Sequence, residues 1–112
     1  MKKLLLILLC VPFIGFGQNV NIPDANFKAY LVGNTAINTN GDAEIQLSEA
    51  TDFNGESDCQ SISSLDLTGI AAFAALNWLQ CNDNQITSLD VSQNTALTYL
   101  QCQSNQLTSL NI

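Results

Sequence analysis

Oxygen-bearing side chains alternate along the segment NTNGDAEIQLSE, residues 38–49. Asn38, Asn40 and Asp42 stand at alternate positions, and Glu49 closes the segment. Ca²⁺ takes six to eight oxygen ligands, and short polar residues at alternate positions of a tight loop bring such oxygens together from a short stretch of chain. The segment therefore predicts a calcium site.

With Asn38 as position 1, the segment resembles the twelve-residue calcium loop of the EF-hand family. That family uses side-chain oxygens at positions 1, 3 and 5, a backbone carbonyl at 7, often a water at 9, and a bidentate glutamate at 12. The resemblance implies this ligand set: Asn38, Asn40, Asp42, the carbonyl of Glu44, Gln46 through water, and Glu49.

Two residues depart from the family pattern. Ala43 stands where the family has glycine, and an alanine held at positive φ costs on the order of 1 kcal/mol. Asn38 replaces the usual aspartate, which leaves only Asp42 and Glu49 as charged ligands and predicts weak affinity, roughly 10⁻⁴ to 10⁻³ M. The alternative is a simple Asn/Gly/Asp turn followed by a helix capped at Ser48.

Two helices are expected to hold this loop. Pro23 favours the first turn of a helix over about residues 24–32, and Gly33 with Asn34 ends it. A short exit helix is expected around residues 48–53. Residues 18–58 would then form a helix-loop-helix cap on the first coil of the region that follows.

Residues 76–91 and 97–112 are two copies of one pattern, LNWLQCNDNQITSLDV and LTYLQCQSNQLTSLNI, with nine of sixteen positions identical at a shift of 21 residues. An imperfect copy, ISSLDL at 62–67, aligns with residues 86–91 at a shift of 24. A coil of this length can bury its apolar positions only against the coils above and below it. The repeat therefore predicts stacked coils that share one core.

Each full copy follows the spacing L-x-x-L-x-C-x-x-N-x-[IL], which resembles the leucine-rich repeat. The resemblance implies an α/β fold: a short solenoid of parallel strands in 21-residue coils behind a small helical N-terminal cap. Residues 59–112 would be about two and a half coils of a truncated array. In the family the asparagine, here Asn84 and Asn105, forms a buried ladder that satisfies loop backbone groups. Second short extended segments are expected near residues 89–91 and 110–112.

Function in such a fold depends on the side chains that the strands present outward. Residues alternate in and out along a strand, so we expect an outward row on the concave face: Trp78, Gln80, Asn82, Tyr99, Gln101 and Gln103. Trp78 should stack beside Tyr99. Aromatic rings and amides give contact area and hydrogen bonds, so the row predicts binding of a protein or carbohydrate ligand. The alternative is that the two rings only stabilise the sheet.

Residues 1–17 have the pattern of a secretory signal peptide, because MKK is followed by fourteen mainly apolar residues that end in small ones. The stretch is shorter than the roughly twenty apolar residues of a membrane-spanning helix. With the IPDANFKAYL segment, the NTNGDAEI loop and the ITSLDVS-type repeats, the whole chain resembles secreted leucine-rich-repeat proteins of the Bacteroidetes. That resemblance implies a secreted or cell-surface location.

The composition of the chain disfavours nucleic-acid binding and enzyme activity, and its cysteines are expected to be unpaired. Ten acidic residues against Lys28 alone give residues 18–112 a net charge of −9, which disfavours nucleic acid as a partner. The chain has no histidine and no arginine, so hydrolytic triads and phosphate clamps lack their usual members and no enzyme activity is expected. Cys59, Cys81 and Cys102 are expected to be free thiols, since in-register cysteines on parallel strands meet in strained geometry; a single Cys81–Cys102 disulfide is the alternative.

Overall fold

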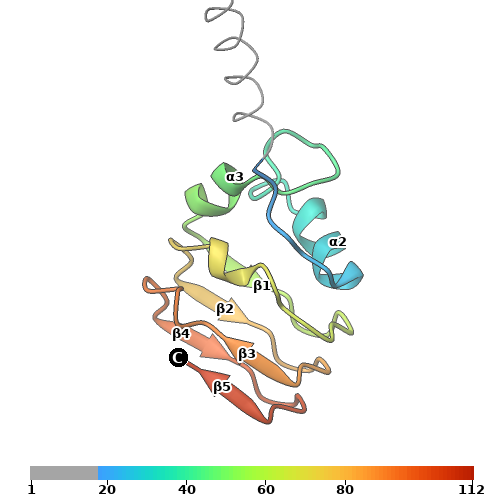
Figure 1. Cartoon of the computed structure of the whole chain (residues 1–112), viewed down its shortest axis with the longest axis vertical. Coiled ribbons are helices and arrows are strands. Elements are labelled where there is room, and N and C mark those ends of the chain that lie inside the picture. Colours follow the sequence, from blue (N-terminus) through green and yellow to red (C-terminus); the bar gives the residue numbers. More distant parts are fainter. Residues whose placement is uncertain (1–17) are drawn as a thin grey trace, which may run out of the picture.

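The computed structural model describes residues 18–112, and the signal peptide expected at residues 1–17 lies outside the described residues. Two helices come first, and short strands stack beneath them in chain order (Figure 1). The helices are α2 (Ala25–Gly33), α3 (Leu47–Asp52) and the short 3₁₀ helix η1 (Ile70–Ala72); the strands are β1 (Glu56–Asp58), β2 (Trp78–Gln80), β3 (Ser88–Asp90), β4 (Tyr99–Gln101) and β5 (Ser109–Asn111).

The strands form two parallel sheets, one with the order β1-β2-β4 and one with β3-β5. Trp78 pairs with Tyr99, and Leu89 pairs with Leu110, so the β2-β4 and β3-β5 pairs keep the 21-residue spacing of the sequence repeat, whereas β1 pairs with β2 at a spacing of 22. The predicted α/β fold with parallel strands is therefore confirmed, and so are the second extended segments. β1 belongs to the first sheet, although the sequence placed residues 56–58 in the cap.

The imperfect copy at residues 62–67 does not add a strand to the β3-β5 sheet. Leu65 is 58% exposed, whereas its counterpart Leu89 is 3% exposed. The cap explains the difference, because a carboxylate oxygen of Asp24 accepts the Leu65 amide at 2.9 Å and the Asn26 amide donates to the Ser63 carbonyl at 3.0 Å. The first coil is bound to the cap instead of pairing with β3.

One apolar core runs from the cap through the second coil. Phe27 and Leu31 of α2 lie in the same cluster as Phe73, Leu76 and Leu79, and all five are almost fully buried. Burial of apolar surface is the main favourable term in folding. The cap helix therefore supplies apolar surface that covers the first coil.

The predicted asparagine ladder is confirmed. The Asn84 amide donates to the carbonyls of Cys59 and Cys81, and its oxygen accepts the amides of Ile62 and Ser64, all within 2.9–3.1 Å. One coil later, the Asn105 amide donates to the carbonyls of Cys81 and Cys102, and its oxygen accepts the Ile86 amide. Each asparagine thus links two coils through backbone groups that would otherwise be unsatisfied.

Both cap helices are found close to their expected bounds. A carboxylate oxygen of Asp24 accepts the Phe27 amide at 2.8 Å and begins α2, which ends at Gly33. α3 begins at Leu47 behind a capping box formed by Gln46 and Glu49. The alternative of a helix capped at Ser48 is therefore wrong, because Glu49 bonds the Gln46 amide and starts the helix earlier.

The three cysteines occupy one position on successive coils and are unpaired, as expected from strained bridge geometry. The Cys59 amide donates to the Gln80 carbonyl and the Cys81 amide to the Gln101 carbonyl, both at 2.8 Å. Burial raises the pKa of Cys59 and of Cys81 to about 12. Within residues 18–112, no helix combines the length and apolar character that crossing a membrane requires.

Candidate functional site

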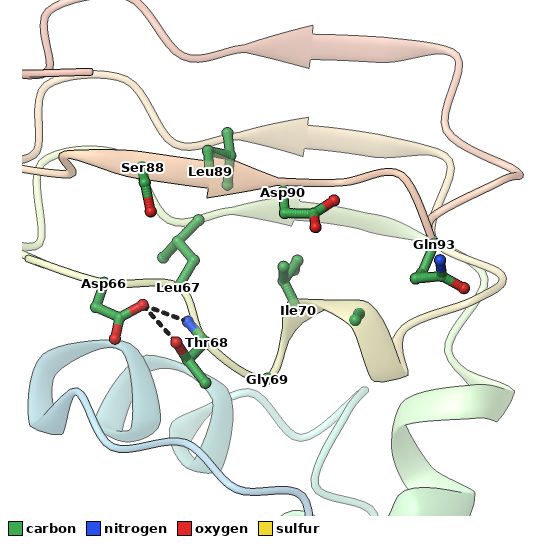
Figure 2. A pocket seen from close by; sticks show the side chains of 10 residues that line it. Asp66, Leu67, Thr68, Gly69, Ile70, Ser88, Leu89, Asp90 and Gln93 are labelled. Atoms are coloured by element: carbon green, nitrogen blue, oxygen red, sulfur yellow. Dashed lines mark hydrogen bonds between the residues drawn. The ribbon is translucent and has the colours of Figure 1, made fainter. Parts of the chain in front are cut away.

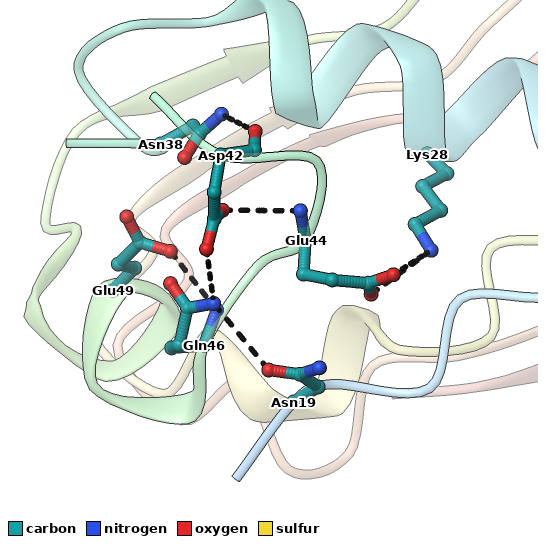
Figure 3. Close-up of polar contacts among 7 residues, drawn as sticks. All are labelled: Asn19, Lys28, Asn38, Asp42, Glu44, Gln46 and Glu49. Carbon is teal, nitrogen blue, oxygen red and sulfur yellow. Dashed lines mark hydrogen bonds and ion pairs between the residues drawn. The ribbon is translucent and has the colours of Figure 1, made fainter. Parts of the chain in front are cut away.

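The candidate calcium loop brings its five predicted side-chain ligands together, with Asn40 bonded to Asp42 and Gln46. Asn38, Asp42, Gln46 and Glu49 gather on one side, while Glu44 points away toward Lys28 (Figure 3). The Lys28 ammonium lies 2.9 Å from the Glu44 carboxylate, so that side chain is neutralised by an ion pair. Position 7 of the loop can therefore contribute only its backbone carbonyl, as the resemblance to the EF-hand implied.

Glu49, the predicted bidentate ligand, is held by backbone amides. One carboxylate oxygen accepts the amides of Thr39 and Asn40 at 2.8 and 3.3 Å, and the other accepts the Gln46 amide at 2.9 Å. Glu49 is only 9% exposed. A buried carboxylate is stabilised by such bonds, and they tie both ends of the loop together.

The turn of the loop differs from the expectation about Ala43. Gly41, at position 4, takes the left-handed backbone with φ of 73°, whereas Ala43 is not among the residues with positive φ. The expected strain at Ala43 is therefore wrong, because the glycine two residues earlier makes the sharp turn. Asn40 and Asp42 support it, since each accepts the backbone amide two residues on at 3.1 Å.

One oxygen in this loop has no hydrogen-bond partner. Asn38 is 4% exposed, and its amide nitrogen donates to the carbonyls of Val32 and Asp42, but its Oδ1 is buried and accepts nothing. A buried acceptor without a donor costs about 1–3 kcal/mol. A cation at the loop would satisfy this oxygen.

The remaining groups fit calcium by donor type, with rearrangement. No three of the His, Cys, Asp and Glu side chains in residues 18–112 gather as metal ligands, so a site here depends on amide oxygens beside Asp42 and Glu49. At present the side-chain amides of Asn40 and Gln46 point nitrogen at the Asp42 carboxylate, at 3.3 and 2.8 Å. Binding an ion requires both amides to turn their oxygens inward.

The outward row on the first sheet has the predicted aromatic pair. The rings of Trp78 and Tyr99 stack with centroids 3.6 Å apart and planes at 11°, which confirms the expected stacking. Beside them, the Gln80 amide donates to the Gln101 side-chain oxygen at 2.7 Å. Trp78, Tyr99 and the two glutamines are half-buried. The rings cover one face of each other, and the indole Nε1 of Trp78 is buried without a hydrogen-bond partner.

The third pair of the row differs between coils. Gln103 is exposed, as expected, but Asn82 is only 6% exposed. The Asn82 amide nitrogen donates to the side chains of Gln60 and Asp83, and its oxygen has no partner. Asn82 is therefore covered by neighbouring polar side chains and offers a partner little surface.

Strand β1 adds three side chains to this face that the sequence reasoning missed. Glu56 pairs in register with Trp78, and Asp58 with Gln80, while Gln60 contacts Asn82. Glu56 and Asp58 are exposed. Aligning Cys59 with Cys81 would have revealed them, since ESDCQ then matches WLQCN at a shift of 22 residues.

A separate hollow of about 240 Å³ lies between β3 and the segment that leads into η1, with Asp66 and Asp90 on opposite walls (Figure 2). One Asp66 oxygen accepts the amide and hydroxyl of Thr68, and Asp90 does the same for Ser92. The Ser92 hydroxyl and amide lower the pKa of Asp90. Both carboxylates are used in local turns, so this hollow has a structural explanation.

Parallel strands at a 21-residue spacing, an asparagine ladder and a helical cap give residues 18–112 the architecture of a short leucine-rich-repeat array. No protein-family model matches the chain. Over 74 residues, it is 42% identical to internalin J of Listeria monocytogenes serotype 4b (strain F2365). The match covers 65% of this chain and 8% of that protein.

Two solved structures share the fold. The functional domain of InlJ from Listeria monocytogenes, which includes a cysteine ladder, matches with a TM-score of 0.66 and 41% identity over 81% of this chain and 20% of that one. The internalin inlF of the same species matches with a TM-score of 0.60 and 20% identity over 83% of this chain and 31% of that one. The chain is thus internalin-like in fold and spans a small part of these relatives.

Proposed function

We propose that the chain is a secreted or cell-surface binding module that contacts a protein partner through the outer face of the β1-β2-β4 sheet. The likeness to internalin J, at 42% identity, supports a binding role, and residues 18–112 contain no histidine or arginine of the kind that hydrolytic and phosphate-binding sites use. The signal peptide and the Bacteroidetes-type origin that the sequence indicates stay predictions.

The observation that carries this proposal is the geometry of the aromatic pair. A sugar ring stacks on an open aromatic face, and the contact between Trp78 and Tyr99 at 3.6 Å closes one face of each ring, so the pair offers a sugar only its outer faces. The polar neighbours of the rings, which are the Gln80–Gln101 amide pair and the acidic strand β1, suit a peptide, because its backbone and side-chain groups can bond them while apolar atoms pack on the rings. A protein partner is therefore favoured over a carbohydrate.

Binding to an array of random 15-residue peptides and to a glycan array tests the proposal. The wild-type chain should bind a set of peptides, and Trp78→Ala should lose at least tenfold in affinity for them because a buried aromatic anchor commonly contributes 2 kcal/mol or more. Leu65→Ala is the matched control, since Leu65 is 58% exposed and lies away from this face. Binding to glycans and not to peptides would show that the ligand is a carbohydrate. Peptide binding that Trp78→Ala leaves unchanged would show that the binding site lies elsewhere.

The loop supports a second proposal, that calcium stabilises the cap. The buried, unpartnered Oδ1 of Asn38 is the observation in its favour. Asp42 and Glu49 would supply charge, while Asn38, Asn40, Gln46 and the carbonyl of Glu44 would supply neutral oxygens. The ion would hold the ends of the loop together and thereby fix α3 on the core.

Thermal unfolding of residues 18–112, followed by circular dichroism in 10 mM calcium and in chelator, tests this second proposal. A dissociation constant of about 1 mM would give roughly 1.4 kcal/mol of stabilisation by mass action, or a rise of about 5–10 °C in the midpoint. Glu49→Gln should abolish that rise, whereas Glu44→Gln should retain it because Glu44 offers only its carbonyl. Equal rises in wild type and Glu49→Gln would reject the site.

A further inference from the structure

The outer face of the first sheet is acidic at one edge and aromatic next to it. Glu56 and Asp58 project from β1 beside Trp78 and Gln80, because the parallel register pairs these residues directly. Neighbouring strands lie about 4.8 Å apart, and alternate residues on one strand about 7 Å apart. The two carboxylates therefore stand within reach of one extended segment of a partner.

No cation of the chain neutralises these carboxylates within residues 18–112. Lys28 is the only basic residue there, and it is paired with Glu44. With nine net negative charges, this part of the chain attracts cationic ligands at long range. Exposed acidic residues alone are common on protein surfaces, so the neighbouring groups decide whether a ligand is recognised.

Trp78 is the first of those neighbours. The strand order β1-β2-β4 puts Tyr99 on one side of Trp78 and Glu56 on the other. Tyr99 covers one indole face, which leaves the other face on the side of the acidic strand. A cation placed over an indole face is attracted by the ring electrons, and a carboxylate beside it adds a charge-assisted hydrogen bond.

Asn82 is a second, independent sign that a donor is missing from this face. Its side chain is 6% exposed, and its Oδ1 is buried with no donor, although its nitrogen is bonded to Gln60 and Asp83. Ammonium and guanidinium groups carry only donors. A basic ligand would supply donors to the Glu56 carboxylate, and it would add a cation to the Asp58 carboxylate, which accepts neutral donors from Gln60 at 3.4 and 3.1 Å.

We propose that the partner of this face is a basic protein segment, in which two lysine or arginine side chains pair with Glu56 and Asp58 and one of them lies over the indole face of Trp78 that Tyr99 does not cover. This inference rests on the proposed function and specifies the chemistry of its partner. Binding then combines one aromatic contact with two charge pairs. The segment needs its basic residues at alternate positions, because Glu56 and Asp58 are two residues apart on one strand.

Fluorescence of Trp78 gives a direct readout, since it is the only tryptophan in the chain. The probe is the capped peptide (Gly-Lys)₄, compared with (Gly-Glu)₄ and (Gly-Gln)₄ at low salt. We expect a saturable change with the lysine peptide alone. The double variant Glu56→Gln, Asp58→Asn should bind it about tenfold more weakly, because close charge pairs dominate such contacts.

The matched control removes the same charge elsewhere. Asp66→Asn with Asp90→Asn leaves the first sheet untouched, and both asparagines keep an oxygen for the local turns; the third coil already has Asn111 at the position of Asp90. This control should bind the lysine peptide within about twofold of wild type at the same salt concentration. Equal weakening in both double variants would show that overall charge alone attracts the peptide and would overturn the inference.

The peptide array separates this inference from the proposed function. Trp78-dependent peptides rich in alternating lysine or arginine support both. Trp78-dependent peptides without basic residues, together with no fluorescence change from the lysine peptide, overturn the basic partner and leave the protein-binding face standing. Loss of every Trp78-dependent interaction overturns both.

Discussion

The second and third coils have nearly the same sequence and very different burial. In residues 76–91 the repeat positions Leu76, Leu79, Cys81 and Ile86 are fully buried. Their counterparts in residues 97–112 are only half-buried, although nine of the sixteen positions are identical. The stabilisation that a residue provides in a solenoid is therefore set by the coils on either side of it.

The same comparison holds for charge. The second coil has Asp83 and Asp90, whereas the third coil has Ser104 and Asn111 at the matching positions and no charged residue. The backbone is unaffected, because Asp83 and Ser104 both adopt positive φ, at 59° and 57°. The turn at Asp83 and Ser104 therefore keeps its backbone conformation, although the side chain is charged in one coil and neutral in the other.

Thiol reactivity should show the largest difference between the two coils. Burial raises the pKa of Cys81 to about 12, so at pH 8 its thiolate fraction should be about a thousandfold below that of an ordinary cysteine. Cys102 occupies the matching position and is half-buried. Iodoacetamide should therefore label Cys102 first, as followed by peptide mass mapping, and label Cys81 only in denaturant. Equal labelling rates without denaturant would mean that the second coil opens as readily as the third.

Removing the ladder asparagines should give the next largest effect. Asn84→Ala leaves the amides of Ile62 and Ser64 and the carbonyl of Cys59 without this partner, and at 1–3 kcal/mol for each buried group the loss should be about 4 kcal/mol. Asn105→Ala should cost about 1–2 kcal/mol, because Asn105 is only half-buried and water can replace it at the groups that it bonds. Urea unfolding at low temperature measures both. Similar losses in the two variants would contradict the comparison.

The repeat made much of the fold predictable from sequence. The strand register, the ladder and the Trp78–Tyr99 stack all follow from a fixed spacing, since one coil constrains the next. Contacts between distant segments were not predictable in this way. The bond from Asp24 to the Leu65 amide spans 41 residues and has no counterpart in the repeat.

The candidate sites also combine features that the sequence predicts with features that depend on packing. The outward positions on β2 and β4 followed from strand alternation, but the burial of Asn82 depends on the particular side chains of Gln60 and Asp83. In the loop, the spacing of the oxygen-bearing residues can be read from the sequence. The capping role of Glu49 and the unpartnered oxygen of Asn38 depend on three-dimensional packing and are seen only in the structure. A polar side chain in such a network can form hydrogen bonds of similar free energy with several neighbours. A sequence pattern does not show which of these hydrogen bonds forms.

Core truncation should distinguish the coils with a smaller difference. Leu79→Ala removes a fully buried side chain from the second coil and should cost about 3 kcal/mol. Leu100→Ala, its partner in register, should cost about 1 kcal/mol because the side chain is already half-exposed. The free energies of unfolding in urea would measure the two losses. A larger loss at Leu100 would show that the third coil contributes more to the core than its burial indicates.

Asp24 extends the comparison to the other end of the solenoid, where the cap covers the first coil. Partial burial would raise the pKa of Asp24, but the amides of Phe27 and Leu65 that donate to its carboxylate outweigh burial, and its pKa lies below the ordinary value. A pKa lowered by folding means that the charged form stabilises the native state above the unfolded pKa, near 3.9, and that this stability is lost as pH falls through the folded pKa.

The Asp24→Ala variant should therefore lose about 1 kcal/mol at pH 7 and progressively less below pH 4. Asp24→Asn is the control, since asparagine also caps helices and should lose less at pH 7. Urea unfolding of all three proteins at pH 7 and pH 2.5 measures the difference. If the loss in Asp24→Ala were the same at both pH values, the carboxylate charge would not be what joins α2 to the first coil, and the covered end would owe its order to apolar contacts alone.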